Sequence, residues 1–410
     1  MAQLNITLDQ ADILRLLEDD TSEAFKVLLQ ETLNGVLRAE SAEQLHAEPY
    51  ERTSKRTGLR NGARERPLAT RIGTITLTVP RHRDVPFKSL IFDNYKRSEA
   101  ALLTTMAEMV VAGVSTAKVG RVMEEICGKS FSKQTVSEAC KELDGAVRDF
   151  KSRPITSQYL FVMADATYLK VRENHRIASK ALLIAIGLTT SGTKEIIGFE
   201  LAPTETKESW TAFLSALRAR GLSGMEMLTS DSHEGIIAAL HEVYPGVAWQ
   251  RCQAHFSRNI TDAAPKKLRV GLRNELVEMF NCDTLEEARA RRDEIVRDYA
   301  EEAPKAMERL DEGFDDAMVV MELPRNMRKC TRTSNYLERL NLEVKRRSKV
   351  IGVFPNEASV ERLIGSVLME IEVSWAASRK VYFANTVDEL SERRSSLIKI
   401  AQLQRQMMAA

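Results

Sequence analysis

Two acidic residues stand where a carboxylate is unfavourable unless it has a partner. Asp165 lies inside the apolar run YLFVMADATYLKV, and a charge in a buried strand costs several kcal/mol unless it is paired or bound to metal. Asp231 follows the apolar segment MEML in TSDSHEG, and ligands of α/β sheets gather where strands end. Two carboxylates about 4 Å apart repel by roughly 4 kcal/mol at an effective dielectric of about 20. Side by side, Asp165 and Asp231 would therefore favour cations between them.

A third acid, Glu338, lies in RTSNYLERLNLEVKRR, whose apolar spacing predicts a helix with one buried side. The same segment is basic, which suits a DNA strand lying across a metal site. The residues expected to contact DNA there are Arg332, Arg339, Arg346 and Arg347. Each acid also has a structural alternative: an ion pair with an arginine for Asp165, a helix N-cap for Asp231, and an exposed i, i+4 pair for Glu338.

Cys252 and His255 in RCQAHFSRN have the C-x-x-H spacing of half a zinc site. No second closely spaced Cys/His pair follows, since Cys282 and Cys330 stand alone, and this disfavours structural zinc. We predict instead that the pair is a hydrogen-bonding brace between the preceding strand and the helices that follow. His233, beside the second acid, could touch the site or merely pack.

The composition is that of an ordinary globular protein. At roughly 100 to 200 residues per domain, 410 residues suggest two to four folding units. No apolar run is long enough to span a bilayer, and the start MAQLNITLDQ lacks the features of a signal peptide. Five scattered cysteines fit a reducing compartment. We therefore expect a cytoplasmic protein without a membrane partner.

Basic charge is concentrated in two segments, although the formal net charge is only +1. Residues 51–100 hold twelve Lys/Arg against five Asp/Glu, and residues 325–349 hold nine against two. A run such as KRRSK can be merely a solvated helix face. Two such clusters beside the acidic motifs favour contact with phosphates.

The N-terminal part reads as a DNA-binding region. We expect residues 1–95 to form a helical and basic strand region, with a strand over 74–79 ended by Pro80. Residues 96–150 have the apolar spacing of three helices, the first ending near Gly113, and the 128–131 connector with Ser132 as N-cap predicts a helix-turn-helix. Its third helix would present Lys133, Gln134 and Lys141 to a DNA groove, although three amphipathic helices also occur in ordinary bundles.

Strand periodicity begins after residue 154. Strands are predicted over 159–171, 179–188 and 194–201, then a helix over 205–220, a strand over 225–229, a helix over 234–244 and a strand over 247–251. This order predicts an α/β fold with a ribonuclease H-like catalytic core over 155–251, although other α/β folds share it. Residues 252–325 then read as an all-helical insertion, 326–375 as the last part of the core with Glu338, and 376–410 as a helical tail.

Five stretches of the chain, in order, resemble the Mutator-type bacterial insertion-sequence transposases. They are NGARERPLATRIGTITLTVPRHR, VMADATYLKVRE, TSDSHEG, RCQAHFSRN and RTSNYLERLNLEVKRRSKVIGVFPN, which together span about residues 60 to 356. The resemblance implies a ribonuclease H-like core with a helical insertion, a catalytic triad of Asp165, Asp231 and Glu338, and the family's C-x-x-H motif at Cys252 and His255.

The resemblance also implies partners and cofactors. The triad would hold two Mg²⁺ or Mn²⁺ ions, whose positive charge attracts a scissile phosphate and activates water or a 3′-hydroxyl. The partners would be the terminal inverted repeats of an insertion sequence and target DNA, bound by a homodimer. The resemblance also implies a bacterial protein that is associated with the nucleoid when bound to DNA. Two alternatives stay open: a catalytically silent DNA-binding regulator derived from a transposase, and a nuclease that hydrolyses DNA without joining it.

Overall fold

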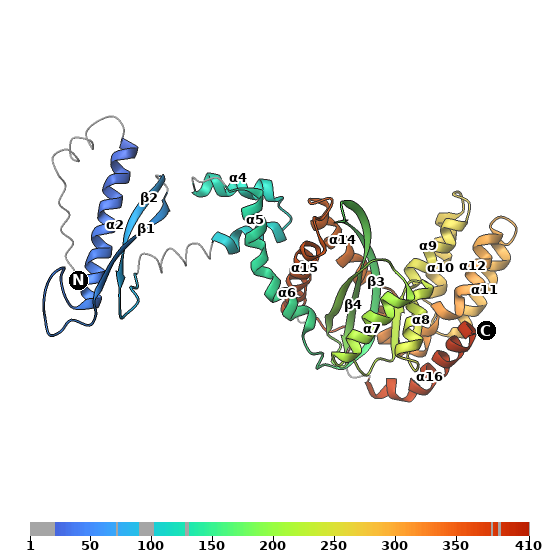
Figure 1. Ribbon diagram of the computed structural model, residues 1–410. Helices are drawn as coiled ribbons and strands as arrows, with labels where there is room; N and C mark the ends of the chain where they lie inside the picture. The colour runs from blue at the N-terminus through green and yellow to red at the C-terminus, as the bar shows by residue number, and fades with distance from the viewer. Residues whose placement is uncertain are drawn as a thin grey trace. The chain divides into compact units, whose positions relative to one another are not determined.

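The computed structural model describes residues 21–70, 73–89, 102–127, 131–378, 380–383 and 387–409 (Figure 1). Contacts divide the chain into two units. The first comprises Met1–Met109 and Thr116–Ala139, and the second comprises Val110–Ser115 and Cys140–Ala410. None of the helices in these described ranges has the length and apolar character needed to cross a bilayer.

In the first unit, helix α2 (Thr21–Leu45) packs on an antiparallel ribbon of β1 (Arg60–Thr70) and β2 (Gly73–His82). Their small core contains Leu37, Leu68, Ile75, Leu77 and Val79. The alternation over 74–79 thus marks a strand, as predicted, but the expectation that Pro80 ends it was wrong. Pro80 pairs with Ala63 inside the ribbon, and each strand of a two-stranded ribbon has an open edge where a residue without an N–H is tolerated.

Two further helices of the first unit, α4 (Thr116–Cys127) and α5 (Lys133–Ala139), contact each other. Ser132 caps α5 as predicted, since its Oγ accepts a hydrogen bond from Thr135 N at 3.0 Å. Residues 128–130 of the predicted turn lie outside the described residues. The predicted third helix is not continuous: α5 is followed by the short 3₁₀ helix η1 (Cys140–Glu142) and then by α6 (Leu143–Ser152), and both of these belong to the second unit.

The second unit is built on a five-stranded mixed sheet. Its strands are β3 (Tyr159–Glu173), β4 (Arg176–Thr189), β5 (Lys194–Ala202), β6 (Met227–Ser230) and β7 (Ala248–Arg251). The order across the sheet is β5-β4-β3-β6-β7, with β3, β4 and β5 antiparallel and β6 and β7 parallel to β3. All five predicted strands are present, and the long central strand β3 carries Asp165.

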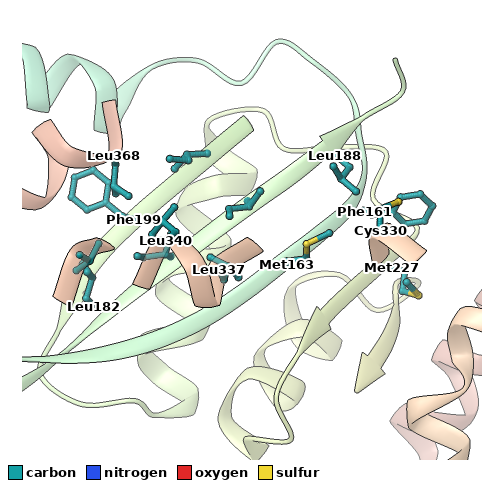
Figure 2. Close-up of a cluster of buried hydrophobic side chains, with 14 of the residues drawn as sticks. Phe161, Met163, Leu182, Leu188, Phe199, Met227, Cys330, Leu337, Leu340 and Leu368 are labelled. Atoms are coloured by element: carbon teal, nitrogen blue, oxygen red, sulfur yellow. The ribbon is translucent and has the colours of Figure 1, made fainter. Parts of the chain in front are cut away.

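Helices cover both faces of this sheet. On one face, α7 (Lys207–Ala219) and α8 (Glu234–Val243) pack against even-numbered residues of β3 such as Val162 and Ala164. On the other, α6, α14 (Asn335–Lys349) and α15 (Glu357–Ser378) pack against odd-numbered residues such as Phe161 and Met163 (Figure 2). Because side chains alternate along a strand, Asp165 lies on the side of Phe161 and Met163, toward α14.

Helices fill the segment between β7 and α14. They are α9 (Gln253–Ala263), α10 (Arg269–Phe280), α11 (Leu285–Tyr299), α12 (Pro304–Ala317), the 3₁₀ helix η2 (Val319–Glu322) and α13 (Arg325–Thr331). This segment has an apolar core of its own, which includes Phe256, Leu276, Ile295 and Phe314. Close packing there depends on Gly313, because a Cβ at this position would lie 2.5 Å from the Phe256 ring.

The last helix, α16 (Val387–Ala409), covers the sheet edge formed by β7. Its Gln404 side chain bonds to the backbone of Trp249 on β7. Trp249 N donates to Gln404 Oε1 at 3.0 Å, and Gln404 Nε2 donates to the Trp249 carbonyl at 2.8 Å. The amide of Gln404 thereby satisfies backbone groups that a sixth strand would otherwise pair with.

Candidate active site

The first acid, Asp165, lies on the central strand β3, and its side chain is bonded to helix α14. Asn341 Nδ2 on α14 donates a hydrogen bond to Asp165 Oδ2 at 2.8 Å. Burial raises the pKa of Asp165 to about 6, and the charge of Asp231 raises it further while that of His255 opposes the rise. Within the described ranges Asp165 forms no ion pair with an arginine, so that alternative is not what holds it; the side chain bonded to it is the amide of Asn341.

The second acid, Asp231, directly follows β6 and is not the N-cap of α8. That position is taken by His233, whose Nδ1 accepts a hydrogen bond from Gly235 N at 3.2 Å. Asp231 Oδ1 accepts one from His233 N at 3.4 Å. The N-cap alternative for Asp231 is therefore wrong, and His233 has a structural role beside the site.

A fourth carboxylate, Glu205, was not identified from the sequence. It follows β5, receives a hydrogen bond from Trp210 Nε1 at 3.2 Å, and lies 3.8 Å from His233 Nδ1. Burial raises its pKa, and the charge of Asp231 adds to the rise while His233 opposes it. The signal that could have found it is its position after a strand parallel to β3, because such strands end at one edge of the sheet.

The third acid, Glu338, lies in the first turn of α14 and faces α9. Its Oε1 is 3.2 Å from His255 Nε2 and 3.4 Å from Arg258 Nη2. Both partners precede it by about 80 residues in the sequence. The alternative of an exposed i, i+4 ion pair within α14 is therefore wrong for Glu338.

His255 joins the acids to one another. Its pKa is raised to about 9, chiefly by the adjacent Cys252 side chain and further by Asp165 and Glu338, whereas burial opposes the rise. The imidazole is therefore positively charged at neutral pH between two carboxylates. The C-x-x-H spacing predicted only a bracing role for His255, and its contact with Glu338 was not predicted.

Cys252 does connect elements, as predicted for the brace, but its partner lies at the start of α14. Its buried Sγ accepts hydrogen bonds from Ser334 N at 3.3 Å and from Ser334 Oγ at 3.2 Å. Gln253 N donates to the Arg332 carbonyl at 3.0 Å. These contacts tie the end of β7 to the turn that precedes Glu338.

Within the described ranges, no three His, Cys, Asp or Glu side chains are placed to hold a metal ion together. The chemistry of Asp165 and Asp231 nevertheless suits a hard divalent cation, because both offer oxygen ligands. Burial is the main cause of the raised pKa of Asp165, and the charge of Asp231 adds to it; a cation between the two carboxylates would relieve this repulsion. Glu338 is engaged by His255 and Arg258 instead.

The predicted DNA-contacting residues lie in different settings. Lys133 and Gln134 are exposed on α5 in the first unit, and Lys141 is exposed on η1 in the second unit. Arg332 is partly buried and bonds to the Phe280 carbonyl at 3.2 Å and to Asn281 Oδ1 at 2.8 Å.

The remaining three arginines lie on α14. Arg339 is exposed, and Arg346 is exposed but paired with Glu343 at 2.6 Å. Arg347 is buried, with 8% of its side chain exposed. It bonds to Glu343, Glu370 and the Val111 carbonyl. Arg347 therefore has a structural role, and it is not among the residues that we propose to contact DNA.

Comparison with known proteins gives a consistent result. The family model "Transposase, Mutator family" matches residues 1–378. The transposase for insertion sequence element IS256 in transposon Tn4001 of Staphylococcus aureus is 40% identical over 93% of this chain and 99% of its own length. The transposase for insertion sequence element ISRM5 of Rhizobium meliloti is 37% identical over 95% and 96%. The transposase for insertion sequence element IS1081 of Mycobacterium tuberculosis is 36% identical over 90% of each. This chain therefore belongs to the Mutator family of transposases.

Proposed function

We propose that this transposase cuts and joins the ends of an insertion sequence with Asp165, Asp231 and Glu338 as its catalytic carboxylates. The observation that carries the proposal is the placement of the acids: Asp165 lies on β3 and is bonded to α14, Asp231 directly follows the neighbouring strand β6, and burial together with the charge of Asp231 raises the pKa of Asp165. Two acids held in mutual repulsion are a common mark of a site that binds cations or transfers protons. His255 links this pair to Glu338.

The sheet, in this proposal, is the ribonuclease H-like core that the sequence resemblance implied. The strand order β5-β4-β3-β6-β7, with three antiparallel strands followed along the chain by two parallel ones, supports it. So does the position of the acids, on the central strand, directly after β6 and on α14. The helices α9 to α13 then form the insertion between the last core strand and the helix that carries the third acid.

Asp165 and Asp231, completed by Glu338, would hold the divalent metal that this chemistry needs, with Mg²⁺ or Mn²⁺ as the ions. When bound, such ions polarise the phosphate and acidify the attacking hydroxyl. Neighbouring side chains position these carboxylates. Asn341 orients the Asp165 carboxylate, and His255 and Arg258 hold that of Glu338 on the side of α9.

Recognition of the terminal inverted repeats is assigned in this proposal to the first unit. The exposed Lys133 and Gln134 on α5, and the basic ribbon before it, support this assignment. We further propose that two copies of the chain act together on DNA. No feature of the described residues favours the silent regulator over the active enzyme.

The test is the single change Asp231→Asn in the full chain. We expect loss of strand cleavage and joining on DNA carrying the terminal repeat, with binding of the same DNA kept, because the change removes a ligand and not a phosphate contact. Glu234→Gln, an exposed position three residues later, is the matched control and should keep activity.

Three outcomes would contradict the proposal in different ways. Joining by Asp231→Asn at the control rate would remove this residue from the triad. A wild-type chain that binds the repeat but never cuts it would be the silent regulator. One that cuts but never inserts a labelled end into a target plasmid would be a nuclease without joining activity.

A further inference from the structure

A cavity lies directly beside Glu338 on the side of the helices α9 and α10. Its volume is about 350 Å³. It is lined by Gln253, Ala254, Ser257, Arg258, Arg273, Val277, Phe280, Asn281, Arg332 and Thr333. The lining therefore comes from the first turns of α9, from one face of α10 and from the turn before α14. Arg258, whose Nη2 is 3.4 Å from Glu338 Oε1, joins the cavity to the acid.

The charge of this cavity is positive. Arg258, Arg273 and Arg332 line it, and no Asp or Glu is among the described residues that do. Arg332 is fixed by the Phe280 carbonyl and Asn281. Arg273 is exposed, and within the described ranges it forms no ion pair or side-chain hydrogen bond. Guanidinium groups in such a setting suit a phosphate.

The cavity also offers groups that a bare anion would not use. Val277 and Phe280 give it an apolar side, with half of Val277 exposed. An aromatic and an aliphatic side chain beside cationic groups are what a nucleobase and its phosphate would contact.

A second basic cavity continues the first. Its volume is about 280 Å³, and it shares Phe280, Asn281 and Arg332 with the larger one. It adds Arg325, Arg328 and Lys329 from α13, and its one acid, Asp283, is paired with Arg325 at 2.6 Å. The two cavities together form a basic track that leads away from Glu338.

We propose that the cavity beside Glu338 binds one nucleotide of the DNA end, unpaired and lifted out of the helical stack, while the strand continues along the basic track. The inference rests on the proposed function and adds a binding site to it. A volume of about 350 Å³ is near the lower limit of pockets that hold small organic molecules, which fits a single nucleotide and excludes a duplex. The arginines bind its phosphate, and the apolar side formed by Val277 and Phe280 contacts its base.

The test uses a carboxylate placed in the cavity. Val277 is half exposed on α10, so a glutamate should be tolerated there. The change Val277→Glu places a negative charge among the three arginines. Val270→Glu is the control, because it is the same change on the same helix at a residue that is 73% exposed and does not line the cavity. Binding is measured with the full chain and a duplex carrying the terminal repeat, in Ca²⁺, with single mismatches placed in turn at each position around the cleaved phosphate.

Unpairing a matched nucleotide opposes binding, whereas a mismatched one is already loosened. We therefore expect that a mismatch at one or two of these positions increases the affinity for the duplex on the order of tenfold, both in the wild type and in Val270→Glu. Val277→Glu should lose this gain. A second variant, Arg273→Gln, should bind more weakly and reduce the log-log salt slope by about 0.7 to 1. Arg289→Gln, an exposed arginine on α11, is its control.

The proposal is overturned if the mismatch gain is absent from the wild type or is the same in Val277→Glu. It is also overturned if Arg273→Gln and Arg289→Gln have the same salt slope. These measurements involve no cutting. A failure here is therefore distinguishable from a failure of the triad, which Asp231→Asn tests by cleavage.

Discussion

The single imidazole of His255 connects the acids more directly than any other side chain. It lies 3.2 Å from Glu338 and interacts with the charge of Asp165, and its raised pKa of about 9 keeps it protonated at neutral pH. A fixed positive charge between carboxylates lowers their repulsion. His255 is thus a positioning residue for the acids.

We predict that His255→Asn reduces strand joining by about tenfold or more while folding and DNA binding stay near wild type, since loss of such orienting partners costs about 10- to 100-fold in activity. His175→Asn, the same change at an exposed turn between β3 and β4, should have no effect. The measurement is joining of a labelled DNA end.

A double-mutant cycle locates the effect. If His255 acts through Glu338, adding His255→Asn to Glu338→Gln should lower the remaining activity no further. Fully additive losses would mean that His255 acts independently of that acid.

At the residue level, the sequence predicted what a local pattern can reveal. Asp165 stands out because a lone charge interrupts an apolar strand, and Asp231 because it follows one. Glu205 and the contact of His255 with Glu338 were not predictable, because they depend on segments that only the fold brings together. His255 and Glu338 meet because the chain, after helices α9 to α13, brings the first turn of α14 back to α9.

Among the elements, helix α12 is closely packed at Gly313. A Cβ at Gly313 would lie 2.2 Å from Arg251 Nη1 and 2.5 Å from Phe256 Cε2. We expect Gly313→Ala to destabilise the protein by about 1–3 kcal/mol, the usual range for overpacking, partly offset by the better helix propensity of alanine. Urea unfolding followed by circular dichroism measures the change.

Gly145 on α6 provides the comparison, because nothing lies within 4 Å of a Cβ built there. Gly145→Ala should leave stability unchanged or raise it. If both substitutions shift the unfolding midpoint in the same direction, the packing of α12 against Phe256 does not determine how alanine at position 313 changes the stability.

The elements themselves were predictable to different degrees. Apolar runs bounded by turns identified β3 to β7, because burial on two faces selects such residues. β1 was missed, since RNGARERP interrupts its alternation with charges. The predicted third helix was divided into α5, η1 and α6, because its apolar spacing continues across the boundary between the two units.

For the whole molecule, that boundary determines which fragment should bind DNA. The core of the second unit includes Val147 of α6, so a fragment ending at 150 would carry an uncovered apolar helix. We predict that residues 1–139 bind terminal-repeat DNA in preference to random DNA, with affinity that falls by a log-log slope of about 0.9 per phosphate contacted. Fluorescence anisotropy at several salt concentrations measures both. Equal affinity for the two DNAs would place specificity in the second unit.

The contact between Gln404 and Trp249 also has a consequence for how the protein is made. Gln404 is synthesised 155 residues after its partner, and until then β7 presents open backbone groups. An open strand edge invites pairing with other chains. During translation the nascent sheet is therefore exposed to aggregation until α16 emerges, and ribosomes that stop before residue 387 would release chains that aggregate. Premature termination would thus yield insoluble protein and not merely a shorter enzyme.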